Sequence, residues 1–85
     1  MSSSAARTTI EADLYAYLSL RFPHLEPCEA GTPLLDGGVD SLGILELMTF
    51  LGNRFGFVLE DSDFEPENFA TPAHIVQFVE RKQSQ

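Results

Sequence analysis

The amino-acid sequence predicts an all-α fold: a four-helix bundle of three longer helices and one short helix, with a long first loop. Three observations lead to this prediction. Apolar residues recur at helical spacing in three separate stretches, and glycines and prolines gather between the first two of them. No segment combines alternating apolar and polar residues with a hairpin turn. A chain of 85 residues has room for one domain of this kind.

The first helix is predicted over residues 8–21. Thr8 stands three positions before Glu11, which is the spacing of a capping box at a helix N-terminus. Apolar residues follow at helical period until Pro23 stops the helix; they are Ile10, Leu14, Tyr17, Leu18 and Phe22. Residues 1–7 are mostly small and polar, so we expect a flexible tail there, followed by one domain over residues 8–85.

A long loop is predicted next, over residues 23–39, because this stretch holds three prolines and three glycines. Ordered loops of this length need apolar contacts with the rest of the domain, and this loop contains four suitable side chains. We expect the following residues to hold it against the core: Leu25, Leu34, Leu35 and Val39.

The second helix is predicted over residues 41–55, with Asp40 as its N-cap and Gly56 as its C-terminal stop. On a helical wheel its apolar residues gather on two nearly opposite sides. One side suffices for the core: Ile44, Leu47, Met48, Leu51 and Phe55. The other side we interpret as an exposed surface kept for docking, although packing beneath a loop would also explain it; it holds Leu42, Leu45 and Thr49, beside Glu46 and Asn53.

The remaining chain has room for one short helix and one longer one. The short helix is expected around residues 63–69, with Pro66 near its first turn. The last helix is expected to start after Thr71 as N-cap and to extend to about Lys82. Arg81 and Lys82 would then lie near the negative end of the helix dipole.

The charge of the chain limits its partners. Thirteen acidic residues against five basic ones give a formal net charge of −8. A field of that sign repels phosphate backbones, so we expect no nucleic-acid partner and expect basic patches on other proteins instead. The single Cys28 can form no internal disulfide, and no apolar run approaches the length of a membrane span. We therefore expect a cytoplasmic monomer that does not bind membranes.

We expect no metal site in this chain. His24 and Cys28 are separated by prolines, and two candidate ligands do not make a zinc site. The acidic run over residues 60–67 departs from a calcium-binding loop at Pro66 and Pro72, so we interpret it as solvated surface.

The most informative position is Ser41, the first residue of the second helix. Its hydroxyl is expected near unpaired amide hydrogens and the positive end of the helix dipole, where an anion such as a phosphodiester is favoured. Gly37 and Gly38 allow an irregular, closely approachable backbone just before it. On these residues alone, however, an unmodified Asp-Ser helix start is the simpler explanation.

From about Thr8 to Lys82, the chain resembles the acyl carrier protein family, which includes peptidyl and aminoacyl carriers. The resemblance starts with Asp40-Ser41-Leu42, after a loop that ends in Gly-Gly-Val. It continues in Leu45-Glu46-Leu47, Phe55-Gly56 and the Glu-Asn-Phe-Ala-Thr stretch over residues 67–71.

The resemblance implies that Ser41 carries 4′-phosphopantetheine, attached from coenzyme A by a phosphopantetheinyl transferase. The thiol of this arm would hold an acyl or aminoacyl group as a thioester. By the same resemblance, Asp40 is the acid beside the serine that helps to position the metal ion of the transferase, and Leu42 faces partner enzymes. With the exposed side of the helix, this predicts a partner surface made of Leu42, Leu45, Glu46 and Thr49.

Two features depart from the carriers of fatty acid synthesis. The second helix holds one acid, Glu46, and Gly43 stands where an acid often follows the motif. We therefore expect a free-standing carrier of a specialised or aminoacyl pathway, without catalytic activity of its own. An adenylating or acyl-loading ligase would load it, and acyl-accepting enzymes would unload it.

Two alternatives remain open at this stage. The chain could be the acyl carrier protein of fatty acid synthesis. It could also be an acidic helical module that is never modified and that binds partners through Leu42 and Leu45.

Overall fold

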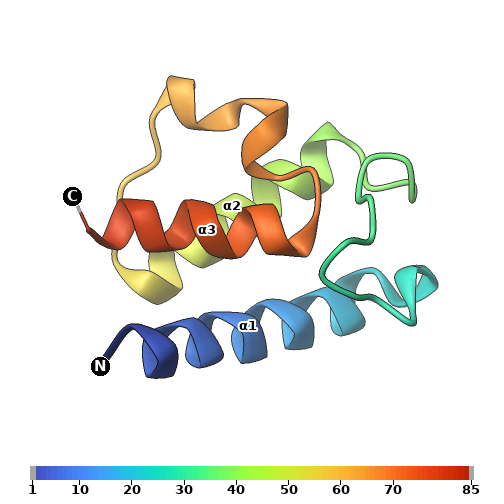
Figure 1. The fold of residues 1–85 in the computed structure, drawn as a ribbon. Coiled ribbons are helices and arrows are strands. Elements are labelled where there is room, and N and C mark those ends of the chain that lie inside the picture. The colour runs from blue at the N-terminus through green and yellow to red at the C-terminus, as the bar shows by residue number, and fades with distance from the viewer. Residues whose placement is uncertain (1, 85) are drawn as a thin grey trace.

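The computed structural model describes residues 2–84, with side chains from residue 7 onward. Over this range it contains three α-helices, three short 3₁₀ turns and no strand, which confirms the all-α prediction. The helices are α1 (Ser2–Arg21), α2 (Ser41–Phe55) and α3 (Pro72–Gln83) (Figure 1).

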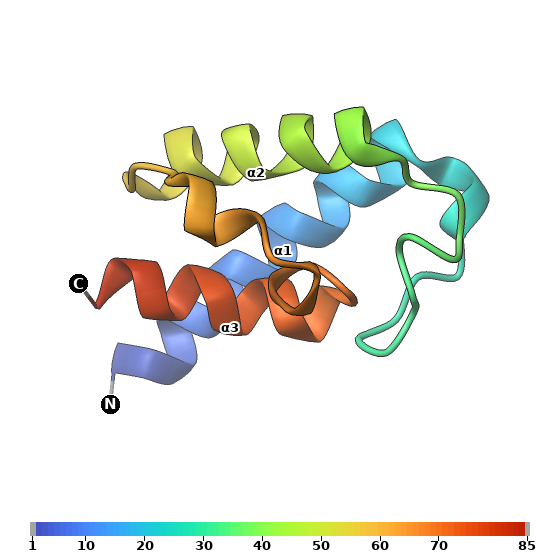
Figure 2. The same cartoon turned by 90° about the horizontal axis from the view of Figure 1, so that it is seen from above.

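The three helices enclose one apolar core. In Figure 1, α1 runs along one side of the molecule, and Figure 2 shows α2 and α3 along opposite sides of that view. The buried helical side chains come from all three elements: Ile10, Leu14 and Leu18 of α1; Ile44, Leu47, Met48 and Leu51 of α2; Ile75, Val76, Phe78 and Val79 of α3. None of the helices among residues 2–84 is long and apolar enough to cross a membrane.

Helix α1 is longer than we expected, because it begins at Ser2 and not at Thr8. The residues before Thr8 include no glycine or proline, and helix geometry continues through them. A capping box marks the start of a helix, so the Thr8–Glu11 spacing was misread. The division into a flexible tail over residues 1–7 and a domain over residues 8–85 remains a prediction.

Helix α2 has the predicted bounds and the predicted caps. The Asp40 side chain caps its N-terminus, and Gly56 ends it in the left-handed conformation with φ 76°. Glycine adopts this conformation without the steric cost that a Cβ imposes. The predicted core side is buried except for Phe55, which is half-buried.

The long loop is attached to the core by three of the four expected side chains: Leu25, Leu34 and Val39. Leu35 is 45% exposed, so its prediction was wrong. The backbone turns tightly here, since the N–H of Val39 donates to the carbonyl of Leu34 at 3.1 Å. Of two adjacent side chains in such a turn, Leu34 points inward and Leu35 points away.

The expected short helix is replaced by two 3₁₀ turns, η2 (Asp61–Phe64) and η3 (Pro66–Asn68). Pro66 has no N–H to continue the helical hydrogen bonds of η2, so the two turns remain separate. We refer to residues 60–69 as the 3₁₀ segment. Figure 1 shows it on the side of the molecule opposite α1.

The acidic run of this segment is not solvated throughout, contrary to our interpretation. Four of its acids are exposed: Glu60, Asp61, Glu65 and Glu67. Asp63 instead pairs with Lys82 of α3 at 2.8 Å, and their side chains are only 13% and 6% exposed. The Lys82 side chain therefore extends from α3 to the 3₁₀ segment. α3 itself begins as predicted, with Thr71 as its N-cap.

Candidate phosphopantetheine attachment site

Ser41 is an exposed residue at the first position of α2. Asp40 before it is extended, and its Oδ1 accepts a hydrogen bond from the Gly43 N–H at 2.8 Å. This cap uses one of the unpaired N–H groups at the helix start. The Ser41 hydroxyl therefore lies in solvent beside the positive end of the α2 dipole, which stabilises an anion bonded there.

The two glycines before Ser41 belong to a tight turn, and the backbone here is irregular, as we expected. A Cβ at position 37 would lie 2.6 Å from Leu25 Cδ2 and 2.9 Å from the carbonyl oxygen of Pro33. Gly38 has φ 96°, which disfavours residues with a side chain. Both glycines are therefore required by the fold of the turn that leads to the serine.

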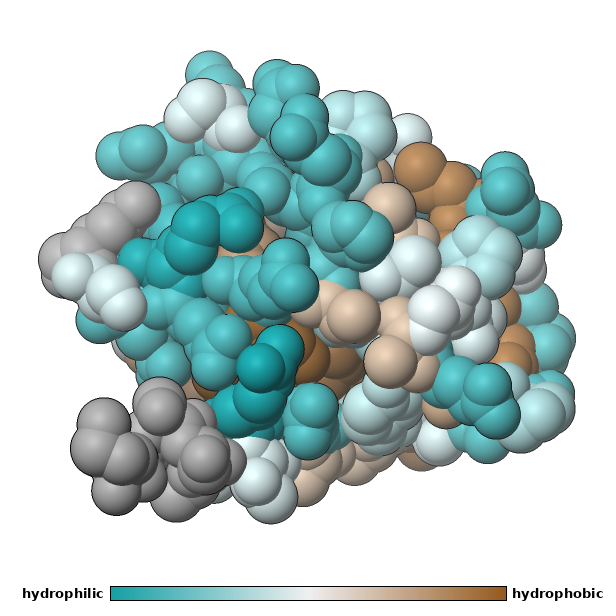
Figure 3. Space-filling view, viewed as in Figure 1, coloured by the Kyte–Doolittle hydropathy of each residue, from teal (hydrophilic) through white to brown (hydrophobic). Residues whose placement is uncertain are grey.

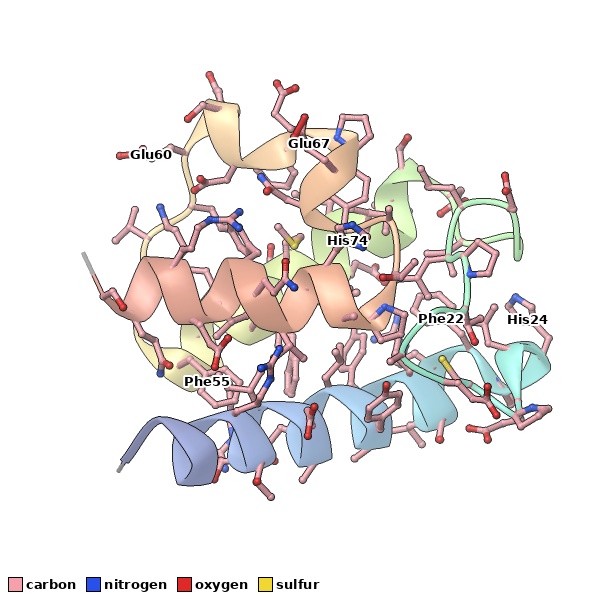
Figure 4. The ribbon with its side chains drawn as sticks, viewed as in Figure 1. Phe22, His24, Phe55, Glu60, Glu67 and His74 are labelled. Atoms are coloured by element: carbon pink, nitrogen blue, oxygen red, sulfur yellow. The ribbon has the colours of Figure 1, made fainter. Side chains whose placement is uncertain are left out.

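His24 helps to hold this turn in place. Its Nε2 lies 3.0 Å from the carbonyl oxygen of Gly37, to which the ring donates a hydrogen bond. Figure 4 shows His24 just beyond the C-terminal end of α1, near the loop that precedes α2. Sequence reasoning considered His24 only as a metal ligand and missed this role, which no local pattern signals.

Gly43 has a structural explanation in the packing of α1 against α2. A Cβ at this position would lie 3.1 Å from the ring of Phe22, which follows the last residue of α1. The absence of a side chain thus lets the aromatic ring lie against the first turn of α2. An acid here, as in many carriers that the sequence resembles, would displace that ring.

The outer face of α2 is exposed, as we interpreted it from the sequence. Leu42 is 62% exposed, Leu45 is 47% exposed, and Thr49 is exposed as well. Packing beneath a loop, the alternative left open above, is therefore wrong. We call Leu42, Leu45 and Thr49 the α2 outer face.

Glu46 lies beside this face, but it is paired. Arg21 Nη2 of α1 donates to Glu46 Oε1 at 2.7 Å, with both side chains nearly half exposed. The Arg21 guanidinium also lies over the ring of Tyr17, which stacks on Phe50 at 4.5 Å. Part of the charge at this edge of α2 is therefore neutralised within the protein.

An apolar pocket of about 280 Å³ opens beside Ser41. One side of it belongs to the α2 start and the preceding turn, and the other side belongs to the 3₁₀ segment. Its lining residues are Leu35, Ser41, Ile44, Phe64, Pro66 and Phe69. Sequence reasoning missed the pocket, because it is formed by residues more than twenty positions apart.

A comparison with protein-family models identifies what these features belong to. The model described as a phosphopantetheine attachment site matches residues 20–79, which is more than half of the chain. The match extends from the end of α1 into α3 and includes Ser41 and every residue that lines the pocket. The chain belongs to the phosphopantetheine attachment site family. A comparison with curated proteins found no match.

Membership in this family confirms the resemblance to carrier proteins that the sequence indicated. The protein is a carrier with a 4′-phosphopantetheine prosthetic group, modified by a phosphopantetheinyl transferase, and not itself an enzyme. Because the group supplies the reactive sulfur, the carrier needs only to hold and present it.

The residues around Ser41 fit such a group. Ser41 is exposed, the helix dipole would stabilise a phosphodiester there, and an apolar pocket lies next to this residue. Cys28 is a poor substitute for the thiol of the arm. Burial raises the pKa of Cys28, and the nearby Glu26 raises it further, against a smaller opposite effect of the Thr32 hydrogen bond. A raised pKa leaves less of the reactive thiolate at neutral pH.

Among the side chains that the structure describes, no group of three or more His, Cys, Asp or Glu residues could hold a metal ion. His24 is engaged with the loop backbone, and His74 lies on the surface, where its Nδ1 is 2.6 Å from Thr71 Oγ1. Figure 4 shows the two histidines on different elements.

Proposed function

We propose that Ser41 is the residue to which 4′-phosphopantetheine is attached, with Asp40 as the acid that helps to position the metal ion of the transferase. The matched region contains two serines, Ser41 and Ser62. Ser41 opens a helix of four turns, whereas Ser62 lies inside the short turn η2. The exposed hydroxyl at the α2 N-terminus is the observation that carries this proposal.

The attached arm would supply a thiol that holds an acyl or aminoacyl group as a thioester. This chain contributes the rest: the helix terminus stabilises the phosphodiester charge, and Asp40 holds the first turn of α2 through its Oδ1. The exposed position of Asp40 leaves this residue accessible to the transferase.

We further propose that partner enzymes dock on the α2 outer face and the adjacent Glu46. Two exposed leucines on one helix face offer apolar area that an interface can bury, worth roughly 1.5–3 kcal/mol for each leucine before the costs of association. The net charge of −8 adds long-range attraction to basic protein surfaces. The same charge repels nucleic acid, which we do not propose as a partner.

The pathway that we propose is a specialised or aminoacyl one, in which an adenylating or acyl-loading ligase loads the carrier and acyl-accepting enzymes unload it. The α2 outer face supports this, since it is apolar and its neighbouring acid is already paired with Arg21. The carrier of fatty acid synthesis is the alternative. We place the protein in the cytoplasm, because its single half-buried cysteine needs no oxidising compartment. We also propose that it is a monomer.

The attachment site is tested by intact mass after incubation with coenzyme A and a broad-specificity transferase. The wild-type chain and Ser62→Ala should each gain one phosphopantetheine group, and Ser41→Ala should gain none. Helical circular dichroism should be nearly the same for all three. A mass gain in Ser41→Ala would place the attachment elsewhere, and no gain in the folded wild-type chain would favour the unmodified interaction module.

A further inference from the structure

The 3₁₀ segment forms one side of the pocket beside Ser41 but buries little apolar surface of its own. Phe64, Pro66 and Phe69 line the pocket, yet neither η2 nor η3 contains a buried residue. Among residues 60–69 only Phe69 is buried. Phe64 is partly buried against the core, so the segment has two apolar contacts with it, and polar interactions add to these in keeping its position.

Polar interactions with the last turns of α3 provide this attachment at the first 3₁₀ turn. Lys82 Nζ lies 2.8 Å from Asp63 Oδ2, and both side chains are almost completely shielded from solvent. The same carboxylate oxygen accepts the Glu60 N–H at 2.9 Å. Asp63 therefore connects the start of the segment to α3, one residue before Phe64 enters the pocket lining.

A second pair of hydrogen bonds continues this attachment to the other 3₁₀ turn. Asn68 Nδ2 donates to the carbonyl oxygen of Asp63 at 2.9 Å, and Asn68 Oδ1 accepts from Arg81 Nη2 at 2.7 Å. Asn68 directly precedes Phe69 of the pocket. We refer to Asp63, Asn68, Arg81 and Lys82 together as the clamp.

The exposed side of the segment offers nothing to replace the clamp. Glu60 and Glu67, labelled in Figure 4, are exposed acids. Figure 3 shows that hydrophilic residues cover this part of the surface. The backbone leaves the segment through Ala70, whose carbonyl accepts the Leu34 N–H at 3.0 Å, and enters it after Gly56 with its φ of 76°. Between Gly56 and the 3₁₀ segment, Phe57 and Leu59 pack against the core, so the segment that the clamp holds begins at Glu60.

We propose that the clamp acts as a latch on the pocket beside Ser41: when it is made, the 3₁₀ segment is held against α2, and when it is released, the segment moves outward and the pocket widens. A buried carboxylate that loses its cation must regain water, and outward movement of the segment supplies it. The use of the widened pocket by the arm rests on the proposed function, whereas the latch is a property of the unmodified chain.

Hydrogen–deuterium exchange of the unmodified protein tests the latch without any step at Ser41. Lys82→Met removes the cation and keeps a long apolar side chain, and it should speed exchange of the amides in residues 61–70 by about tenfold. Amides in the middle of α2 should change by less than about twofold. Asp63→Asn, which keeps the shape and the acceptor for Glu60, should give the same local pattern.

Two further variants serve as controls. Lys82→Arg keeps the charge and should restore slow exchange in the segment. Arg54→Met removes an ion pair of the same length between α2 and α1, with Asp13 at 2.8 Å, and should leave residues 61–70 unchanged.

The latch is overturned by equal acceleration over the whole chain in both Lys82→Met and Asp63→Asn, or by no local change in either. Since exchange is measured before modification, this result is separate from the mass test of Ser41. A chain can fail one test and pass the other.

Discussion

The two sides of the pocket are held in place by different physical means. The α2 side rests on the core, where Leu47, Met48 and Leu51 are completely buried beneath the helix. The 3₁₀ side rests on the clamp, two hydrogen bonds and one ion pair from side chains of α3 and the segment. Apolar burial is insensitive to pH and depends on contact area, whereas an ion pair depends on the charge of both partners.

This difference assigns separate roles to the two sides. The side that presents Ser41 is fixed with the fold as a whole, so this serine, the proposed attachment point, keeps its position relative to the outer face of α2. The opposite side has one buried apolar residue, Phe69, and is otherwise held by the polar contacts of the clamp.

The largest effect is expected from Leu47→Ala, which would break the α2 side. It removes a completely buried side chain from the core and should lower the free energy of unfolding by about 2–5 kcal/mol. Urea denaturation followed by circular dichroism measures this loss. A loss below about 1 kcal/mol would mean that the core can collapse around the site. The α2 side of the pocket would then be no more firmly held than the 3₁₀ side.

An intermediate effect is expected from acid, through the Asp63 carboxylate of the 3₁₀ side. Burial tends to raise the pKa of Asp63, but the hydrogen bonds from Lys82 and the Glu60 N–H, with the charges of Lys82 and Arg81, hold it below its usual range. A carboxyl with a lowered folded pKa stabilises the fold above its unfolded pKa of about 3.9 and loses this contribution as pH falls further.

The stability of wild-type protein relative to Asp63→Asn should therefore be greatest near neutral pH and should decrease below about pH 4. Unfolding midpoints of both proteins, measured from pH 7 downward, check this. The charged groups that act on the Asp63 carboxylate are Lys82 and Arg81 from α3, and the backbone N–H of Glu60 in its own segment donates to it. A difference between the two proteins that is the same at all pH values would rule out an ionic contribution of Asp63.

The smallest effect on stability is expected on the exposed side of α2. Leu42→Ala should change the free energy of unfolding by no more than about 0.5 kcal/mol, because Leu42 is 62% exposed. If partners dock there, the same substitution should slow modification by the transferase by about tenfold. Val58→Ala, on a residue that is 80% exposed but lies beyond α2, is the matched control and should slow it little. Equal rates for both variants would contradict docking on the α2 outer face.

The helical part of the fold could be predicted because its signals are local. Asp40 and Gly56 mark the ends of α2 by the cap chemistry of single residues, and Thr71 does the same for α3. The start of α1 was missed because its first residues carry neither a stop signal nor apolar spacing. The exposed face of α2 was predictable from helical period alone.

The pocket and the clamp could not be predicted, because both depend on residues distant in the sequence. Nothing near Asp63 distinguishes it from its acidic neighbours; only the approach of Lys82, from another element, sets it apart. Leu35 was assigned to the core by its side chain, although the turn that it belongs to decides its direction. Ser41 was predicted as the attachment site because the resemblance to carrier proteins is carried by Asp40-Ser41-Leu42, a local motif that depends on no distant partner.

Phe22, the residue after α1, packs against Gly43 in the first turn of α2. A designer who wished to give α2 the acidic character of other carriers would choose position 43 for a glutamate, and that single change would push the aromatic ring out of its place. A Cβ at position 43 would lie 3.1 Å from Val39 Cγ1 as well, so a smaller residue at position 22 would relieve one of two close contacts. The substitutions at positions 22 and 43 should therefore be introduced together. A library that varies only one of these positions would miss pairs of residues that fold well in combination.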